Sequence, residues 1–185
     1  MMAFEPLRRV VSRALPLPQS NIDTDQILPA RYLQKPRSDD FGHYLFKDLR
    51  ADPAFPLERM RGAAPRIVVA GRNFGCGSSR EHAVWALVDG GFRVVIAPSF
   101  GDIFQSNAAK NGLLTVTLDE PTMHALLAQA AAGGELTIDL EAQRAAGHAF
   151  EIAPFVKRCL LEGLDELAFT LQHLPQIEAF ERENP

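Results

Sequence analysis

The stretch RIVVAGRNFGCGSSREHAVWALV, residues 66–88, contains an apolar strand, a glycine-rich turn and an amphipathic helix in succession. We expect the strand at 66–70 and the helix from about Ser79 to Val88. The segment NFGCGSSREHA, residues 73–83, spans the junction between them. Because backbone N–H groups at the start of a helix lack intrahelical partners, such a junction attracts anions. The stretch therefore predicts a strand–turn–helix unit that binds an oxyanion beside a hydroxyl.

The residues of this turn each suit that chemistry. Gly75 and Gly77 permit a left-handed backbone or a close approach. Ser78 and Ser79 can cap the helix and offer their hydroxyls to a ligand. Arg80 carries the planar fork of donors that matches a carboxylate. The plainer interpretation is an ordinary serine-capped helix that follows a glycine turn.

The same turn lacks the features of a nucleotide site. A P-loop has a lysine after its glycines, and none is present here. A dinucleotide-binding turn has a third glycine at the position of Arg80, where a guanidinium would crowd a pyrophosphate. A small di- or tricarboxylate is therefore the better fit.

Composition and charge narrow the class of protein. The 185 residues are 46% hydrophobic and 23% charged, which suits one globular domain. The net charge of −4 disfavours a nucleic-acid partner, because phosphate binding needs a basic face. No apolar stretch approaches the roughly 18 to 20 residues that span a bilayer, and the first residues do not resemble a secretory signal. We therefore expect no membrane association and a cytoplasmic location.

The pattern of cysteines and histidines does not indicate a metal centre. Cys76 and Cys159 lie far apart, and neither belongs to a CxxC pair. The five histidines show no HxH or HExxH spacing. Because an iron–sulfur cluster or a structural zinc needs three or four ligands, we expect this chain alone to hold no metal.

The rest of the chain alternates strand-like and helical segments, which indicates a mainly parallel α/β core. In such sheets ligands lie beyond the carboxyl ends of the strands, where the glycine turn is placed. An irregular loop over 30–61, with one short helix near 41–49, precedes this core. The further expected strands are 93–97, 114–118 and a pair at 136–140 and 148–152; the further expected helices are 101–109, 121–131, 154–162 and 164–171.

The segment GCGSSREHA, residues 75–83, resembles the active-site motif of the swivelling domain of the aconitase superfamily. Further blocks are similar to the small-subunit family of bacterial isopropylmalate isomerases (3-isopropylmalate dehydratases) of leucine biosynthesis. These blocks are NIDTDQILPARYL (21–33), FGHYLF (41–46), VVIAPSFGDIF (94–104) and GLDELAFTLQH (163–173). The resemblance covers about 7–180. It implies one swivelling β/β/α domain over 1–185, like the C-terminal domain of aconitase, with a mostly parallel sheet flanked by helices and further helices at about 154–185.

The resemblance also implies an activity and a partner. The family interconverts 2-isopropylmalate and 3-isopropylmalate by dehydration and rehydration through isopropylmaleate. A separate large subunit carries a [4Fe-4S] cluster whose open iron accepts the leaving hydroxyl. This chain would bind no cofactor itself and would act only in a heteromer, on a small dicarboxylate.

Site residues follow from matching the motif position by position. Ser78 matches the family's base, which removes the proton next to a carboxylate. Ser79 and Arg80 match contacts to the substrate carboxylate, and Gly77 lies beside them as a further substrate contact. Cys76 is expected to pack within the turn rather than to act as a nucleophile.

Two other segments are expected to contribute to the site. The resemblance implies a specificity loop at the start of 30–61, where Tyr32 and Leu33 are the candidates for an apolar pocket around the isopropyl group. Arg37 would instead suit a substrate with a further carboxylate. In the block at 21–33, Asp23, Thr24 and Asp25 either line the site and brace Arg80 or form a turn that caps a helix.

Three alternatives remain open from the sequence. The chain could be the small subunit of a related hydro-lyase for citraconate, methylmalate or homoaconitate, because one alkyl group gives only about 1 to 3 kcal/mol of discrimination. It could be a non-catalytic module that binds carboxylates. A hydrolase that uses Ser78 or Cys76 is disfavoured, because no histidine and acid can be assigned to assist either nucleophile.

Overall fold

The structure is a computed structural model that describes residues 3–36, 41–60, 62 and 64–184. Within this part of the chain, seven strands form one mixed sheet in the order β4-β3-β2-β1-β5-β6-β7. The strands are β1 (Arg9–Leu17), β2 (Ile67–Ala70), β3 (Val94–Ala97), β4 (Leu114–Thr117), β5 (Glu135–Asp139), β6 (Arg144–Ala145) and β7 (His148–Ala149).

The sheet has a parallel half and an antiparallel half that share β1. Strands β1 to β4 run parallel, and Ala14 of β1 lies opposite Ile67 of β2. Strand β5 runs antiparallel to β1, with Val10 opposite Ile138. Every residue of β2 and β3 is buried, which explains their unbroken apolar sequences. This arrangement confirms the expected α/β fold with a mostly parallel core.

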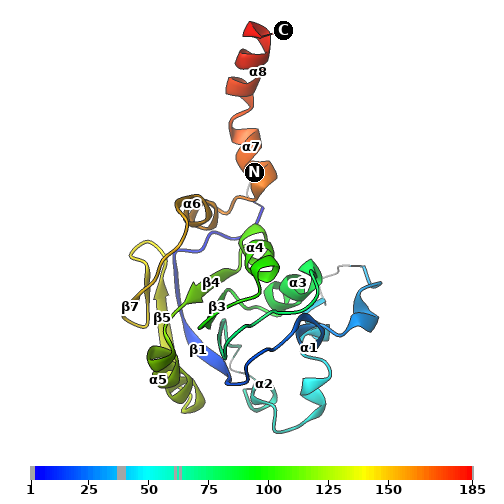
Figure 1. Ribbon diagram of the computed structural model, residues 1–185, viewed down its shortest axis with the longest axis vertical. Coiled ribbons are helices and arrows are strands. Elements are labelled where there is room, and N and C mark those ends of the chain that lie inside the picture. Colours follow the sequence, from blue (N-terminus) through cyan, green and yellow to red (C-terminus); the bar gives the residue numbers. More distant parts are fainter. Residues whose placement is uncertain (1–2, 37–40, 61, 63, 185) are drawn as a thin grey trace.

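Helices cover both faces of the sheet (Figure 1). They are α1 (Thr24–Ile27), α2 (Pro56–Arg59), α3 (Glu81–Asp89), α4 (Asp102–Lys110), α5 (Glu120–Ala131), α6 (Pro154–Glu162), α7 (Glu166–Gln172) and α8 (Leu174–Glu183). Helices α3 and α4 close one apolar core with α1 and the segment after it. Helices α5 and α6 close a second core on the opposite face. In Figure 1, α7 and α8 extend away from the body of the molecule.

Strand β1 was not expected as a regular element, because Pro16 and Pro18 interrupt its sequence. Its first half, 9–13, pairs only with β5, and its second half, 14–17, pairs only with β2. Pro16 therefore lies where one side of the strand has no partner, so its missing N–H costs little. The tertiary structure places this proline-containing strand at the centre of the sheet.

Three other expectations about elements need correction. The helix expected from Ser79 begins at Glu81, because the two serines belong to the turn. The expected pair at 136–140 and 148–152 is separated by β6, which pairs with both β5 and β7. The C-terminal helices expected at about 154–185 include a third helix, α8, which follows α7 after a break at His173 that was not predicted.

The described residues of 30–61 are irregular, as expected, but they form several short helical turns rather than one helix. These are the 3-10 turns η1 (Ala30–Tyr32), η2 (Phe41–Tyr44) and η3 (Leu49–Ala51), followed by α2. Aromatic and aliphatic side chains hold the segment against the first core, among them Phe41 and Phe46, which are fully buried. None of the helices in the described part of the chain combines the length and apolarity that a membrane crossing requires.

Candidate functional site

The loops that follow β1, β2 and β3 meet at the carboxyl edge of the parallel strands. Backbone hydrogen bonds join neighbouring loops: Asn21 donates to the carbonyl of Arg72 (2.8 Å) and Phe74 donates to that of Ser99 (3.1 Å). The side-chain Nδ2 of Asn73 also donates to Oδ1 of Asn21 at 2.8 Å. The glycine turn therefore lies between two other loops, and its position is fixed by main-chain contacts.

Two glycines give this turn its shape for different reasons. Gly75 has a φ of +73°, and a β-carbon there would lie 2.2 Å from Cγ of Phe104. Gly77 has a φ of +90°, but a β-carbon there would meet nothing closer than Asp23, at 3.5 Å. Gly75 is thus required by both backbone and packing, whereas Gly77 is required by backbone conformation alone.

The first turn of α1 lies directly against residues 75–80 of the glycine turn, which carry Ser78 and Ser79 and are called the serine turn below. Asp23 caps α1 by accepting from the amide of Gln26, whose side chain accepts from the Asp23 amide in return. The amide of Thr24 donates to the carbonyl of Cys76 (3.0 Å), and its hydroxyl donates to the carbonyl of Ser78 (3.1 Å). The helix-capping interpretation of Asp23 is confirmed, and the structure joins the two motifs that the sequence separates.

Ser78 and Ser79 are exposed at the outer end of the turn. The interpretation of these serines as helix caps is wrong, because Arg80 is the N-cap of α3 and no side chain caps that helix. A backbone bond of 2.8 Å from Arg80 to the carbonyl of Ser78 keeps the serines outside the helix. Within the described residues, neither hydroxyl nor the N–H groups of Gly77, Ser78 and Ser79 make a hydrogen bond.

Arg80 brings a positive charge beside these free donors. Its guanidinium forms an ion pair with Asp25 of α1 and is only 22% exposed, whereas the Asp25 side chain is 51% exposed. One guanidinium nitrogen bonds to Asp25, and a guanidinium has five N–H donors in all. The turn therefore presents an anchored cation, two hydroxyls and several N–H groups, which together suit a carboxylate.

The residues expected in the specificity loop pack against other parts of the chain than the serine turn. Tyr32 is half-buried and stacks on Tyr44 with ring centroids 4.4 Å apart, and Leu33 packs against the first core. Among the described residues, no hydrogen bond or ring contact joins Tyr32 or Leu33 to the serine turn. Arg37 lies outside the described residues.

The other reactive side chains near the turn have packing contacts. Burial, with a smaller contribution from nearby Asp23, raises the pKa of the Cys76 thiol above its usual range. His82 contacts the ring of Trp85 at a centroid distance of 4.4 Å, and Glu81 accepts from Asn111 at 2.7 Å. No group of three or more metal-ligating side chains gathers anywhere among the described residues.

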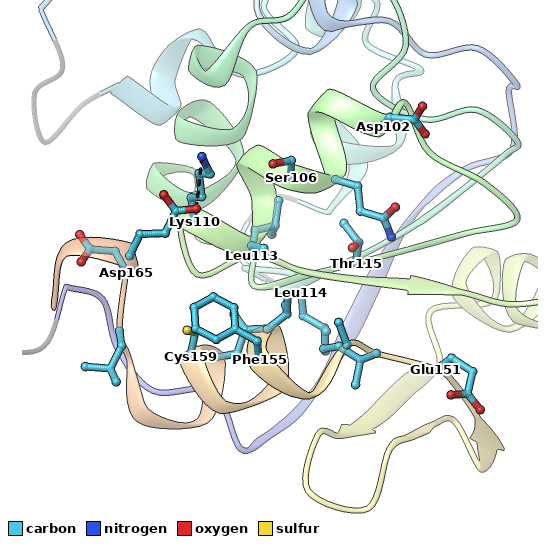
Figure 2. Close-up of a pocket in the computed structure, with 18 residues that line it drawn as sticks. Asp102, Ser106, Lys110, Leu113, Leu114, Thr115, Glu151, Phe155, Cys159 and Asp165 are labelled. Carbon is cyan, nitrogen blue, oxygen red and sulfur yellow. Dashed lines mark ion pairs between the residues drawn. The ribbon is translucent and has the colours of Figure 1, made fainter. Parts of the chain in front are cut away.

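A groove of about 740 Å³ lies elsewhere, between α4, β4 and α6 (Figure 2). Figure 2 shows apolar side chains such as Leu114 and Phe155 along it, and Lys110 is paired with Glu166 at 3.4 Å. The groove contains no residue of the serine turn. Its cation is already neutralised and its lining is mostly apolar, so it suits a dicarboxylate less well than the turn does.

The fold and the serine turn define an aconitase-type C-terminal domain. The family described as the Aconitase C-terminal domain matches residues 5–121, which contain the parallel strands and the site. The 3-isopropylmalate dehydratase small subunits of Rubrobacter xylanophilus and Acidobacterium capsulatum are 48% and 47% identical to this chain. Each alignment covers 98% of this chain, and 96% and 91% of the relative, respectively. The chain therefore belongs to the family of 3-isopropylmalate dehydratase small subunits.

A solved structure agrees with this assignment. The crystal structure of 3-isopropylmalate dehydratase from Methanocaldococcus jannaschii is similar to this chain, with a TM-score of 0.66 and 26% identity. The similarity covers 96% of this chain and 99% of that one. The similarity therefore extends over nearly the whole of both chains, beyond the residues 5–121 that the family matches.

Proposed function

We propose that this chain is the small subunit of a heteromeric isopropylmalate isomerase of leucine biosynthesis, which interconverts 2-isopropylmalate and 3-isopropylmalate through isopropylmaleate. The observation that carries the proposal is the serine turn. The hydroxyls of Ser78 and Ser79 and the N–H groups of residues 77–79 have no hydrogen-bond partner among the described residues, and Arg80 lies beside them, half-buried. The membership of the chain in a family of hydro-lyase small subunits supports the same reaction.

In this proposal Ser78 is the base that removes the proton next to a substrate carboxylate. A serine hydroxyl is a weak base unless negative charge on its oxygen is stabilised. The free N–H groups of Gly77 and Ser79, together with the start of α3, supply that stabilisation. The exposure of Ser78 leaves its oxygen accessible to a bound substrate.

Arg80 binds the carboxylate next to the reacting carbon, with Ser79 and Gly77 as further contacts. The ion pair to Asp25 uses one guanidinium nitrogen, so the remaining donors are available to the substrate. As the proton leaves, charge develops on the carboxylate, and the guanidinium offsets it. Asp23, Thr24 and Asp25 hold the turn and the guanidinium in place without contact to the reacting atoms.

The reaction also needs an acceptor for the leaving hydroxyl. The described residues of this chain do not fit a [4Fe-4S] cluster, because Cys76 lies in the serine turn and Cys159 on α6, remote in sequence and with no further cysteine. We place the cluster on the large subunit, where its open iron supplies Lewis-acid assistance to departure of the hydroxyl. The site is thus divided between two chains, with the base and the carboxylate contacts on this one.

We further propose that residues 1–185 act as one swivelling domain in the cytoplasm, without a nucleic-acid or membrane partner. The net charge of −4 supports the absence of a nucleic-acid partner. Tyr32 and Leu33 line the pocket for the isopropyl group once the large subunit covers the site.

The test compares the purified chain alone with the chain mixed with a large subunit prepared anaerobically. Isopropylmaleate absorbance is followed after 2-isopropylmalate is added, and iron is measured in both preparations. We expect no activity and no iron in the chain alone, and activity in the mixture. Activity of the isolated chain, or none with any large subunit of the family, would overturn the proposal.

A further inference from the structure

Thr24 holds the serine turn at two points. Its amide donates to the carbonyl of Cys76 at 3.0 Å, and its hydroxyl donates to the carbonyl of Ser78 at 3.1 Å. The residue is only 2% exposed, so neither bond competes with water. Thr24 therefore fixes the orientation of two peptide groups, Cys76–Gly77 and Ser78–Ser79.

The direction of these carbonyls determines where the neighbouring N–H groups point. In a planar trans peptide the C=O and the following N–H point in opposite directions. Because the carbonyls of Cys76 and Ser78 face Thr24, the N–H groups of Gly77 and Ser79 face away from it. These are two of the N–H groups that lack a partner among the described residues.

The residues on either side of Thr24 act on the same turn. Asp23 lies beside Gly77, and Asp25 holds the guanidinium of Arg80. Backbone pairing at Asp23 and Cys76 continues the parallel arrangement beyond the sheet. Three consecutive residues at the start of α1 thus contact the serine turn and hold its conformation.

We infer that Thr24 is a positioning residue for the isomerisation: its hydroxyl orients the Ser78–Ser79 peptide so that the N–H of Ser79 faces the negative charge that develops on Ser78. The inference rests on the proposed function of Ser78. Thr24 does not contact the substrate, and its effect passes through the Ser78 carbonyl. The hydroxyl is the decisive group, since the amide of residue 24 is present in every variant.

The experiment uses Thr24→Val, which removes the hydroxyl at nearly constant size, and Thr24→Ser, which keeps it. Thr115→Val on β4 is the matched control, because Thr115 is half-buried and remote from the turn. Each variant is assayed with the large subunit well below its melting temperature, and kcat and KM are determined separately. We expect Thr24→Val to lower kcat by about tenfold or more with little change in KM. Thr24→Ser and Thr115→Val should stay within about threefold of the parent chain, since neither removes the hydroxyl that orients the turn.

A second readout does not depend on activity. In the ¹⁵N-labelled full chain, Thr24→Val should shift the amide resonance of Ser79 more than that of Gly77, and Thr24→Ser should leave both near their original positions. Unchanged resonances in Thr24→Val would overturn the inference even if the proposed function holds. An inactive parent mixture would overturn the proposed function, whereas the amide shifts would still decide whether Thr24 orients the turn. A loss of kcat that Thr24→Ser does not restore would also count against the role of the hydroxyl.

Discussion

The guanidinium of Arg80 lies against the carboxylate of Asp25, although 55 positions separate the two residues in sequence. The pair joins α1 to the start of α3 across the serine turn. It anchors the cation of the site at one nitrogen and leaves the other donors open. The charge on Arg80 is therefore partly balanced before any substrate carboxylate arrives, and its side chain is already in position.

Replacement of Ser78 by alanine tests the base. We expect Ser78→Ala to lower kcat by roughly 10² to 10⁴ while KM changes little, because a general base acts in the transition state rather than in substrate binding. Isopropylmaleate formation by the two-subunit enzyme measures both constants. Ser106→Ala is the control, since Ser106 is also an exposed serine and lies on α4. Equal losses in kcat and in affinity would contradict the role of Ser78 as a base.

Replacement of Arg80 by lysine tests the carboxylate contact. Lysine keeps the charge but loses the planar fork, so we expect KM to rise by about 10- to 100-fold, as for loss of a charged hydrogen bond of roughly 1.5 to 3 kcal/mol. Arg158→Lys on α6 is the matched control for Arg80→Lys, because Arg158 also forms an ion pair, with Glu162 at 3.1 Å. An unchanged KM in Arg80→Lys would show that the arginine is only structural.

The glycines of the turn should differ in what they contribute. Gly77→Ala places a side chain at a φ of +90°, at a cost of about 1 to 3 kcal/mol in the free energy of unfolding. Gly147→Ala carries the same kind of strain at a φ of +87° in open space, so it should destabilise equally. Only Gly77→Ala should also lower activity, because it alone distorts the turn. Chemical denaturation and the isomerase assay measure the two effects.

Gly75→Ala should be more damaging than Gly77→Ala. Its β-carbon would lie 2.2 Å from the ring of Phe104, so strain in packing adds to strain in the backbone. A midpoint of unfolding no lower than that of Gly77→Ala would contradict this ranking.

The reactivity of Cys76 should depend on pH in a predictable direction. Burial raises the pKa of this thiol, so the folded chain contains less thiolate at neutral pH than an unfolded peptide does. Alkylation by iodoacetamide in a Cys159→Ala background should therefore be slow at pH 7 and should accelerate above the usual thiol range. Because the unfolded thiol ionises first as pH rises, this residue's contribution to stability should also fall in alkaline solution. Alkylation of the native chain as fast as that of the denatured chain at pH 7 would contradict the prediction.

Leu33 should influence which alkylmalate the enzyme prefers. If its side chain meets the isopropyl group, Leu33→Ala should reduce the preference for 2-isopropylmalate over methylmalate by about tenfold, within the roughly 1 to 3 kcal/mol that an apolar pocket provides. The ratio of kcat/KM for the two substrates measures this. Leu57→Ala, at another partly buried leucine of the same long segment, controls for loosened packing. An unchanged ratio would place the alkyl pocket elsewhere.

Much of the parallel core follows from the chain locally. The runs at 67–70 and 94–97 are apolar throughout and lie between turns, so burial on both faces is dictated by composition. The helices α4, α5 and α6 lie close to their expected bounds, because glycines and prolines mark their ends. Strand β1 could not be predicted in this way, since its two halves are stabilised by different partners, β5 and β2.

The sequence by itself determined the kind of site: the serines, the arginine and the two glycines that suit an anion all lie within residues 75–80, and their chemistry does not depend on distant residues. Only the tertiary structure decided how that site is built. It placed the serines outside α3 and set Thr24 and Asp25 against a turn more than fifty positions away. The physical reason is that parallel strands bring their carboxyl ends to one edge, and side-chain contacts between the loops at that edge exist only once the sheet has formed.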